Sequence, residues 1–129
     1  MNKKVGTKLA SVTLFVHGFI ETVGAVALIA LPSEFLITAG YAPKEGKIIF
    51  MAAFAAIFGL SRLAAGYVTW SMKKWGIAFG MVLSMITMIV APLMHLFGDI
   101  NLSSVVMDLL LAVIVLASLL YASFGSEKL

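Results

Sequence analysis

Four long apolar runs decide what this chain of 129 residues can fold into. Each run is close to the roughly 20 residues that an α-helix needs to cross about 30 Å of hydrocarbon. The runs are apolar on every side, whereas a strand of a membrane barrel alternates over about 10 residues. They cover about residues 9–31, 48–70, 75–97 and 102–124. The sequence therefore predicts an all-α, polytopic membrane protein, with residues 1–129 forming a single domain, a four-transmembrane-helix bundle.

The breaks between the runs are short and polar, and they leave no room for a soluble domain. The longest break covers residues 32–47. Within it, residues 34–41 are moderately apolar, which favours a short turn of helix at the membrane interface. Any function must therefore lie inside the bundle, on its rims or in a partner.

The lysines give the expected orientation, because basic residues of membrane proteins gather on the cytoplasmic side. Two lysines, Lys44 and Lys47, fall on one side of the predicted bundle. The other side holds Lys3, Lys4, Lys8, Lys73, Lys74 and Lys128. We therefore expect both termini in the cytoplasm and a multi-pass protein of the cell membrane, if the source is prokaryotic. The formal net charge of +3 follows from this bias, and without a basic stripe it does not indicate nucleic acid.

Three ionisable residues lie within the first two apolar runs: His17 and Glu21 in the first, and Arg62 in the second. A charged side chain at mid-bilayer costs at least about 2.5–3.5 kcal/mol. With a rise of about 1.5 Å per residue, His17 and Arg62 lie at the same depth and Glu21 lies one turn further out. His17 and Glu21 also share one helix face, because they are four residues apart.

This spacing supports two interpretations. In the first, Glu21 and Arg62 form a buried ion pair that fixes the register of two helices, and His17 is hydrogen-bonded beside them. In the second, the three residues form a ligand-binding pocket for a polar head group, a quinone or a proton. Ionisable residues inside membranes are often functional, but the sequence leaves both interpretations open.

A second polar group is expected near the outer side, formed by His95, Asp99 and Asp108. Asp108 lies about 9 Å below the outer surface, where a carboxylate needs a partner, and His95 is the nearest candidate. The three are weak candidates for a divalent metal site, since their spacing matches no established signature. The two histidines differ in depth by about 15 Å, which disfavours a haem held by both. No cofactor is predicted, although a quinone is possible.

Small residues indicate where helices pack closely, because lipid tails do not drive helices together. The second run is rich in alanine and glycine, so we expect it to be the central helix. The fourth run has few small residues, so we expect it to be the most exposed to lipid. Gly76 and Gly80 form a GxxxG pair that indicates packing within the chain or, as the less favoured alternative, a homodimer.

Three segments together carry a family resemblance. They read HGFIE at 17–21, RLAAG at 62–66 and KKWG at 73–76. In this combination the chain resembles small four-span membrane proteins of the DoxX-like kind, over nearly its whole length. The resemblance implies a four-span fold. Since some of these proteins are linked to quinone-coupled oxidation of sulfur compounds, it also implies a quinone near Arg62.

No catalytic motif is present, and the absence of cysteine excludes thiol catalysis and disulfides. The sequence therefore leans away from an enzyme. It favours a non-catalytic accessory subunit or assembly factor of a larger membrane complex, with a respiratory or quinone-linked complex as one option. The expected partners are the lipid bilayer and either other membrane subunits or a second copy.

Two alternatives remain. One is a stand-alone binder of a quinone, lipid or other small hydrophobic ligand in the pocket of His17, Glu21 and Arg62. The other, less favoured, is a small proton-coupled carrier, because carriers usually show repeats and broken helices.

Overall fold

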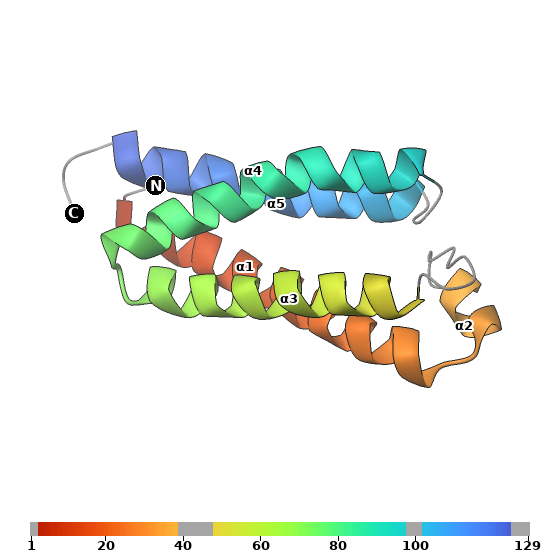
Figure 1. The fold of residues 1–129 in the computed structure, drawn as a ribbon. Helices are drawn as coiled ribbons and strands as arrows, with labels where there is room; N and C mark the ends of the chain where they lie inside the picture. The colour runs from red at the N-terminus through yellow and green to blue at the C-terminus, as the bar shows by residue number, and fades with distance from the viewer. Residues whose placement is uncertain (1–2, 39–47, 98–101, 125–129) are drawn as a thin grey trace.

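The computed structural model describes residues 3–38, 48–97 and 102–124, and these residues form five helices (Figure 1). Four of them are long and apolar enough to cross a membrane, which agrees with the four predicted spans to within a few residues except at the start of the first. The fifth, short helix coincides with the apolar part of the longest break. In order, the helices are α1 (Lys3–Ala30), α2 (Ser33–Thr38), α3 (Ile48–Trp70), α4 (Lys74–Leu96) and α5 (Leu102–Phe124).

The four long helices run alternately up and down. The start of α1, the end of α5 and the connection from α3 to α4 lie at one end of the bundle, and α2 lies at the other (Figure 1). The connection from α3 to α4 is only three residues long, and its Met72 has a φ of 64°. This arrangement is compatible with both termini on one side of a membrane. That this side is the cytoplasm stays a prediction.

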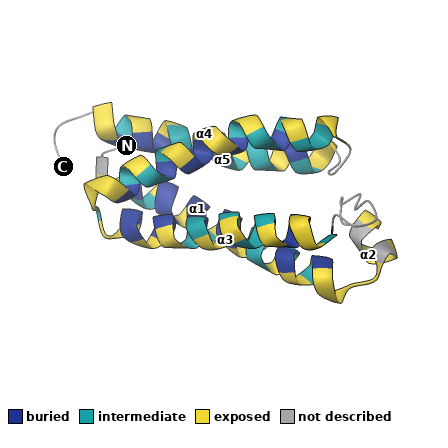
Figure 2. Cartoon of the chain, in the orientation of Figure 1, coloured by how far each residue is buried: buried dark blue, intermediate teal, exposed yellow. Residues whose placement is uncertain are grey.

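The central helix is α1, so the expectation that the second span is central was wrong. Helix α1 packs along both α3 and α5, whereas α4 packs on α5 and α3. In its apolar part, 39% of α1 is buried, against 28% of α3, 28% of α4 and 33% of α5. Helix α5 is therefore not the most exposed span either (Figure 2). Its buried residues follow a helical spacing: Val105, Ala112, Val115, Ser118, Leu119 and Ala122.

Glycines set the close approach of α1 and α3. A Cβ atom at Gly18 would lie 2.7 Å from the carbonyl oxygen of Gly59, and one at Gly59 would lie 2.9 Å from the backbone nitrogen of Thr22. Both contacts involve backbone atoms, which cannot move aside as a flexible side chain can. The two helices can therefore cross this closely only because neither position carries a side chain.

The GxxxG pair of α4 also packs within the chain. Gly76 lies against the backbone of Val68 in α3, and Gly80 lies against the side chains of Leu119 and Leu14. The glycine face is thus already covered by helices of the same chain. This favours the intrachain interpretation, and self-association stays a prediction.

The half of the bundle near the α3–α4 connection is tightly packed. Its apolar core consists of Ala10, Leu14, Ala65, Leu83, Val115 and Leu119, all buried. Ser11 in α1 donates a 2.5 Å hydrogen bond to the carbonyl oxygen of Gly66 in α3. Near the end of the bundle, the Lys8 ammonium lies 3.9 Å from the centre of the Trp70 ring. The other half, toward α2, is packed less closely and contains the cavity described below.

Candidate functional site

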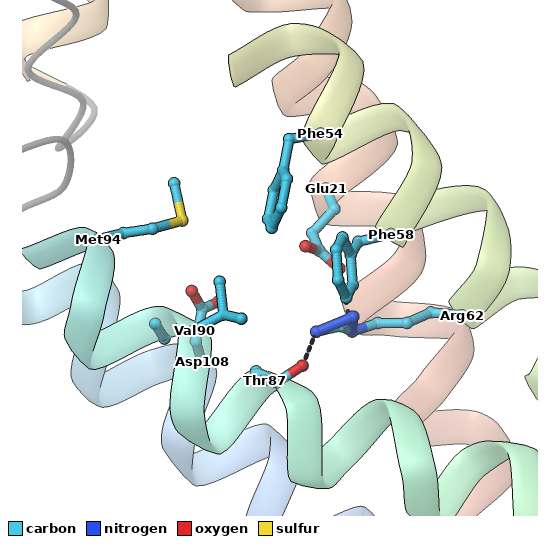
Figure 3. A pocket seen from close by; sticks show the side chains of 9 residues that line it. Glu21, Phe54, Phe58, Arg62, Thr87, Val90, Met94 and Asp108 are labelled. Carbon is cyan, nitrogen blue, oxygen red and sulfur yellow. Dashed lines mark hydrogen bonds and ion pairs between the residues drawn. The ribbon is translucent and has the colours of Figure 1, made fainter. Parts of the chain in front are cut away.

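Polar side chains from four helices meet near the middle of the bundle. They are His17 and Glu21 of α1, Arg62 of α3, Thr87 of α4 and Asp108 of α5, called the polar cluster below. Figure 3 shows Glu21, Arg62, Thr87 and Asp108. The structure brings together the three residues that the sequence proposed for a pocket. It adds Thr87 and Asp108, which the sequence did not place there.

Arg62 is the centre of the polar cluster and is only 3% exposed. Its Nε donates a hydrogen bond to Nδ1 of His17 at 3.2 Å, and the same nitrogen lies 3.0 Å from Oε1 of Glu21. Its Nη2 donates to the hydroxyl oxygen of Thr87 (Figure 3). The only arginine of the chain therefore ties together α1, α3 and α4.

These contacts fix the protonation pattern of the His17 ring. A guanidinium has only donors, so Nδ1 of His17 must be the acceptor of the bond from Arg62. The ring proton of a neutral imidazole then sits on Nε2, which donates to Oδ1 of Asp108 at 3.1 Å. Asp108 thus holds the ring of His17 in one orientation, and through it joins α5 to the polar cluster.

This pattern gives a spectroscopic prediction. In ¹⁵N NMR spectra of the protein in a bilayer, we expect His17 to show a protonated Nε2 and an unprotonated Nδ1. The chain has two histidines, so a His95→Gln variant assigns the signals without further labelling. A His17 ring protonated on Nδ1 alone, or on both nitrogens, would contradict the bond from Arg62.

Two buried atoms of the polar cluster have no hydrogen-bond partner among the residues that the structure describes. They are Oε1 of Glu21 and Nη1 of Arg62. Oε1 is close to Nε of Arg62, but the single N–H of that nitrogen is directed to His17. The cluster therefore retains one free acceptor and one free donor, and a buried polar atom left in this state costs about 1–3 kcal/mol.

The two carboxyl groups of the polar cluster have different partners. Oε1 of Glu21 lies 3.0 Å from Nε of Arg62, whereas Oδ1 of Asp108 lies 3.1 Å from Nε2 of His17. Both carboxyl groups line the cavity.

A cavity of about 430 Å³ extends from the polar cluster toward the α2 end of the bundle. Apart from Glu21, Ser104 and Asp108, its lining is apolar: Ile20, Val23, Gly24, Ala27, Leu28, Met51, Phe54, Ala55, Met94 and Met107. A smaller pocket of about 30 Å³ lies directly at Arg62 and shares Glu21, Phe54, Met94 and Asp108 with it. The two spaces adjoin at these shared residues and together have apolar walls and a polar floor. Figure 3 shows the smaller of the two.

The structure places one member of the second predicted group, Asp108, in the polar cluster, and the candidate metal site of His95, Asp99 and Asp108 stays a prediction. The hydrogen bond of the Asp108 carboxylate is to His17 and not, as the sequence suggested, to His95. Asp99 lies outside the described residues. Within the described ranges, no group of three or more His, Cys, Asp or Glu side chains is placed to hold a metal ion. Asp108 contacts His17 and not His95 because α5 packs against α1, which puts Asp108 next to the first helix.

Comparison with known proteins gives no relative: no family model matches the chain, and no curated protein or solved structure is significantly similar to it. The resemblance to DoxX-like proteins therefore stays a prediction. Function has to be inferred from the polar cluster and the cavity.

Proposed function

We propose that this protein binds a small hydrophobic molecule inside the membrane, with the polar end of the molecule at Arg62, Glu21 and His17. The observation that supports this is the cavity of about 430 Å³ with apolar walls and a polar floor. Small-molecule sites typically measure about 300–1,000 Å³ and combine apolar walls with a few convergent polar groups.

The chemistry of the walls supports a hydrophobic body for the ligand. Methionine and phenylalanine side chains adapt to apolar molecules of different shapes, and Met51, Phe54, Met94 and Met107 all line the cavity. A quinone belongs to this class of hydrophobic molecules with a polar end.

A cavity-filling variant tests this proposal. Native mass spectrometry of the protein, extracted mildly from its own membranes, should show the chain with a bound small molecule. Ala55→Trp puts an indole into the cavity wall and should reduce the bound fraction about tenfold, a change of about 1.4 kcal/mol in binding. Ala64→Trp is the matched control, because Ala64 is an exposed position of the same helix.

The same spectra test the accessory-subunit prediction. A chain that leaves the membrane in fixed stoichiometry with other proteins, and without a small molecule, would overturn the proposed function and support a subunit role. A bound molecule retained equally by Ala55→Trp and Ala64→Trp would place binding outside the cavity.

A further inference from the structure

We infer that the cavity opens sideways to the lipid between α1 and α5, and that its ligand enters there from the hydrocarbon of the bilayer. The opening, called the portal below, is formed by Ile20, Val23 and Met107. This inference rests on the proposed function and specifies where the ligand comes from and by which route. It makes these three side chains the ones that control the rate of binding.

The first argument comes from the exposure of the residues that line the cavity, which is partly open to the outside. Ile20 is 40% exposed, Val23 51% and Met107 39%, although all three line the cavity. The other described residues that line it are buried or half-buried. A side chain that borders both the cavity and the outside lies at the rim. Since the three come from α1 and α5, the opening lies between these two helices.

The second argument comes from the course of the two helices. They are joined by the 3.1 Å hydrogen bond between His17 and Asp108. On one side of this bond the apolar core fills the space between them, and on the other side they diverge toward α2 (Figure 1). At about 1.5 Å per residue, Ile20 and Val23 lie about 4.5 and 9 Å beyond His17 on the diverging side. Met107 lies about 1.5 Å beyond Asp108 on the same side. The portal therefore begins where the close contact of α1 and α5 ends.

The third argument comes from the size and flexibility of the side chains at the portal. Gly24 and Ala27 line the cavity on the same stretch of α1 as Ile20 and Val23. Neither carries more than a methyl group, so the space between α1 and α5 stays open here. Met107, on α5, has an unbranched side chain with three rotatable bonds, and it can swing aside while a molecule passes.

The depth and chemistry of the portal identify the source of the ligand. Met107 lies about 8 Å from the start of α5 at Leu102, and Ile20 lies about 15 Å from the end of α1 at Ala30. In helices that cross about 30 Å of hydrocarbon, this level lies among the acyl chains. All three portal side chains are apolar, and contact with water would be unfavourable for them. The ligand therefore comes from the hydrocarbon of the bilayer and not from water.

The test measures how fast a probe enters and leaves the cavity. A narrowed portal slows both steps and leaves the affinity nearly unchanged, because the bound and free states stay the same. The probe is decanol, titrated into the delipidated protein in lipid bicelles. The methyl groups of Ala27 and Ala55 line the cavity and report its filling. The line shapes of their NMR signals give the association and dissociation rates.

Two variants narrow the portal from its two sides, Val23→Trp on α1 and Met107→Trp on α5. In each, we expect association and dissociation to be about tenfold slower than in the wild type, with a dissociation constant within about twofold. Val26→Trp is the matched control and should keep the wild-type rates, because Val26 is an exposed valine of the same helix that is not among the described residues lining the cavity. The two variants are independent, so one that fails to fold leaves the other as the test.

The outcomes separate the inference from the proposed function. If the portal variants exchange decanol at the wild-type rate, the cavity is entered elsewhere and the portal inference is wrong. If they instead raise the dissociation constant about tenfold, as expected for Ala55→Trp, their side chains lie at the bound molecule and not on its route, which also contradicts the inference. If decanol does not shift the alanine signals saturably in the wild type, the proposed function itself fails.

Discussion

Replacing Gly59 with leucine is expected to give a protein that enters the membrane but does not form the packed bundle. Even a Cβ atom at this position would lie 2.6 Å from the hydroxyl oxygen of Thr22 and 3.0 Å from the carbonyl oxygen of Gly18. A leucine must therefore push α1 and α3 apart along the crossing where their backbones meet. Overpacking of a core typically costs about 1–3 kcal/mol, and we expect the upper end of that range or more because backbone atoms are involved.

The measurement is unfolding in mixed micelles at rising dodecyl sulfate fraction, followed by near-ultraviolet circular dichroism. Ala64→Leu is the matched control, because it adds a similar side chain to an exposed position of α3 and should change stability by less than about 0.5 kcal/mol. Equal midpoints for Gly59→Leu and the wild type would show that α1 and α3 do not cross at Gly18 and Gly59.

Replacing Arg62 with leucine is expected to lower the free energy of unfolding by about 3–5 kcal/mol, the usual cost of removing one partner from a buried charge network. The change leaves the carboxylate of Glu21 without its ion-pair partner, and the Nδ1 atom of His17 and the hydroxyl oxygen of Thr87 without their donor. Lysine should restore only part of the loss, because an ammonium cannot present several donors in one plane.

A second substitution separates charge from packing. Leucine at both Arg62 and Glu21 removes the unpaired carboxylate along with the guanidinium, so the double variant should recover about 1–3 kcal/mol of the single-variant loss. Lys74→Leu, at an exposed lysine, controls for the loss of a positive charge as such. If the double variant loses as much free energy of unfolding as the two single variants lose together, Glu21 and Arg62 do not interact energetically.

The positions of the helices were predictable because hydropathy and length alone decide where a chain can span a membrane. Depth along the helix was almost as informative, since it placed His17 and Arg62 at one level, and the structure joins them by a hydrogen bond. The same arithmetic could have found Asp108. It lies about 9 Å from the outer end of its helix, within reach of the level of Glu21.

The sequence could not tell which helix faces which. The exposed and the buried residues of α5 are both mostly apolar, so hydropathy alone does not identify the buried side. Small residues showed correctly that α3 packs closely at Gly59, but α1 has the most neighbours. The cavity was also beyond prediction, because its volume depends on how far the helix pairs diverge toward α2 and on no single residue.

The tightly packed half of the bundle limits what the site can do. Leu14, Leu83, Val115 and Leu119 are buried between the polar cluster and the α3–α4 end. An ion crossing this layer would have to shed its hydration, which is prohibitive in a medium without compensating charges. This layer therefore closes the polar cluster toward the α3–α4 end of the bundle. If the proposed ligand binds in the cavity, we therefore expect it to enter from the half of the bundle near α2, and a molecule in the opposite leaflet would have to change leaflets before it could bind.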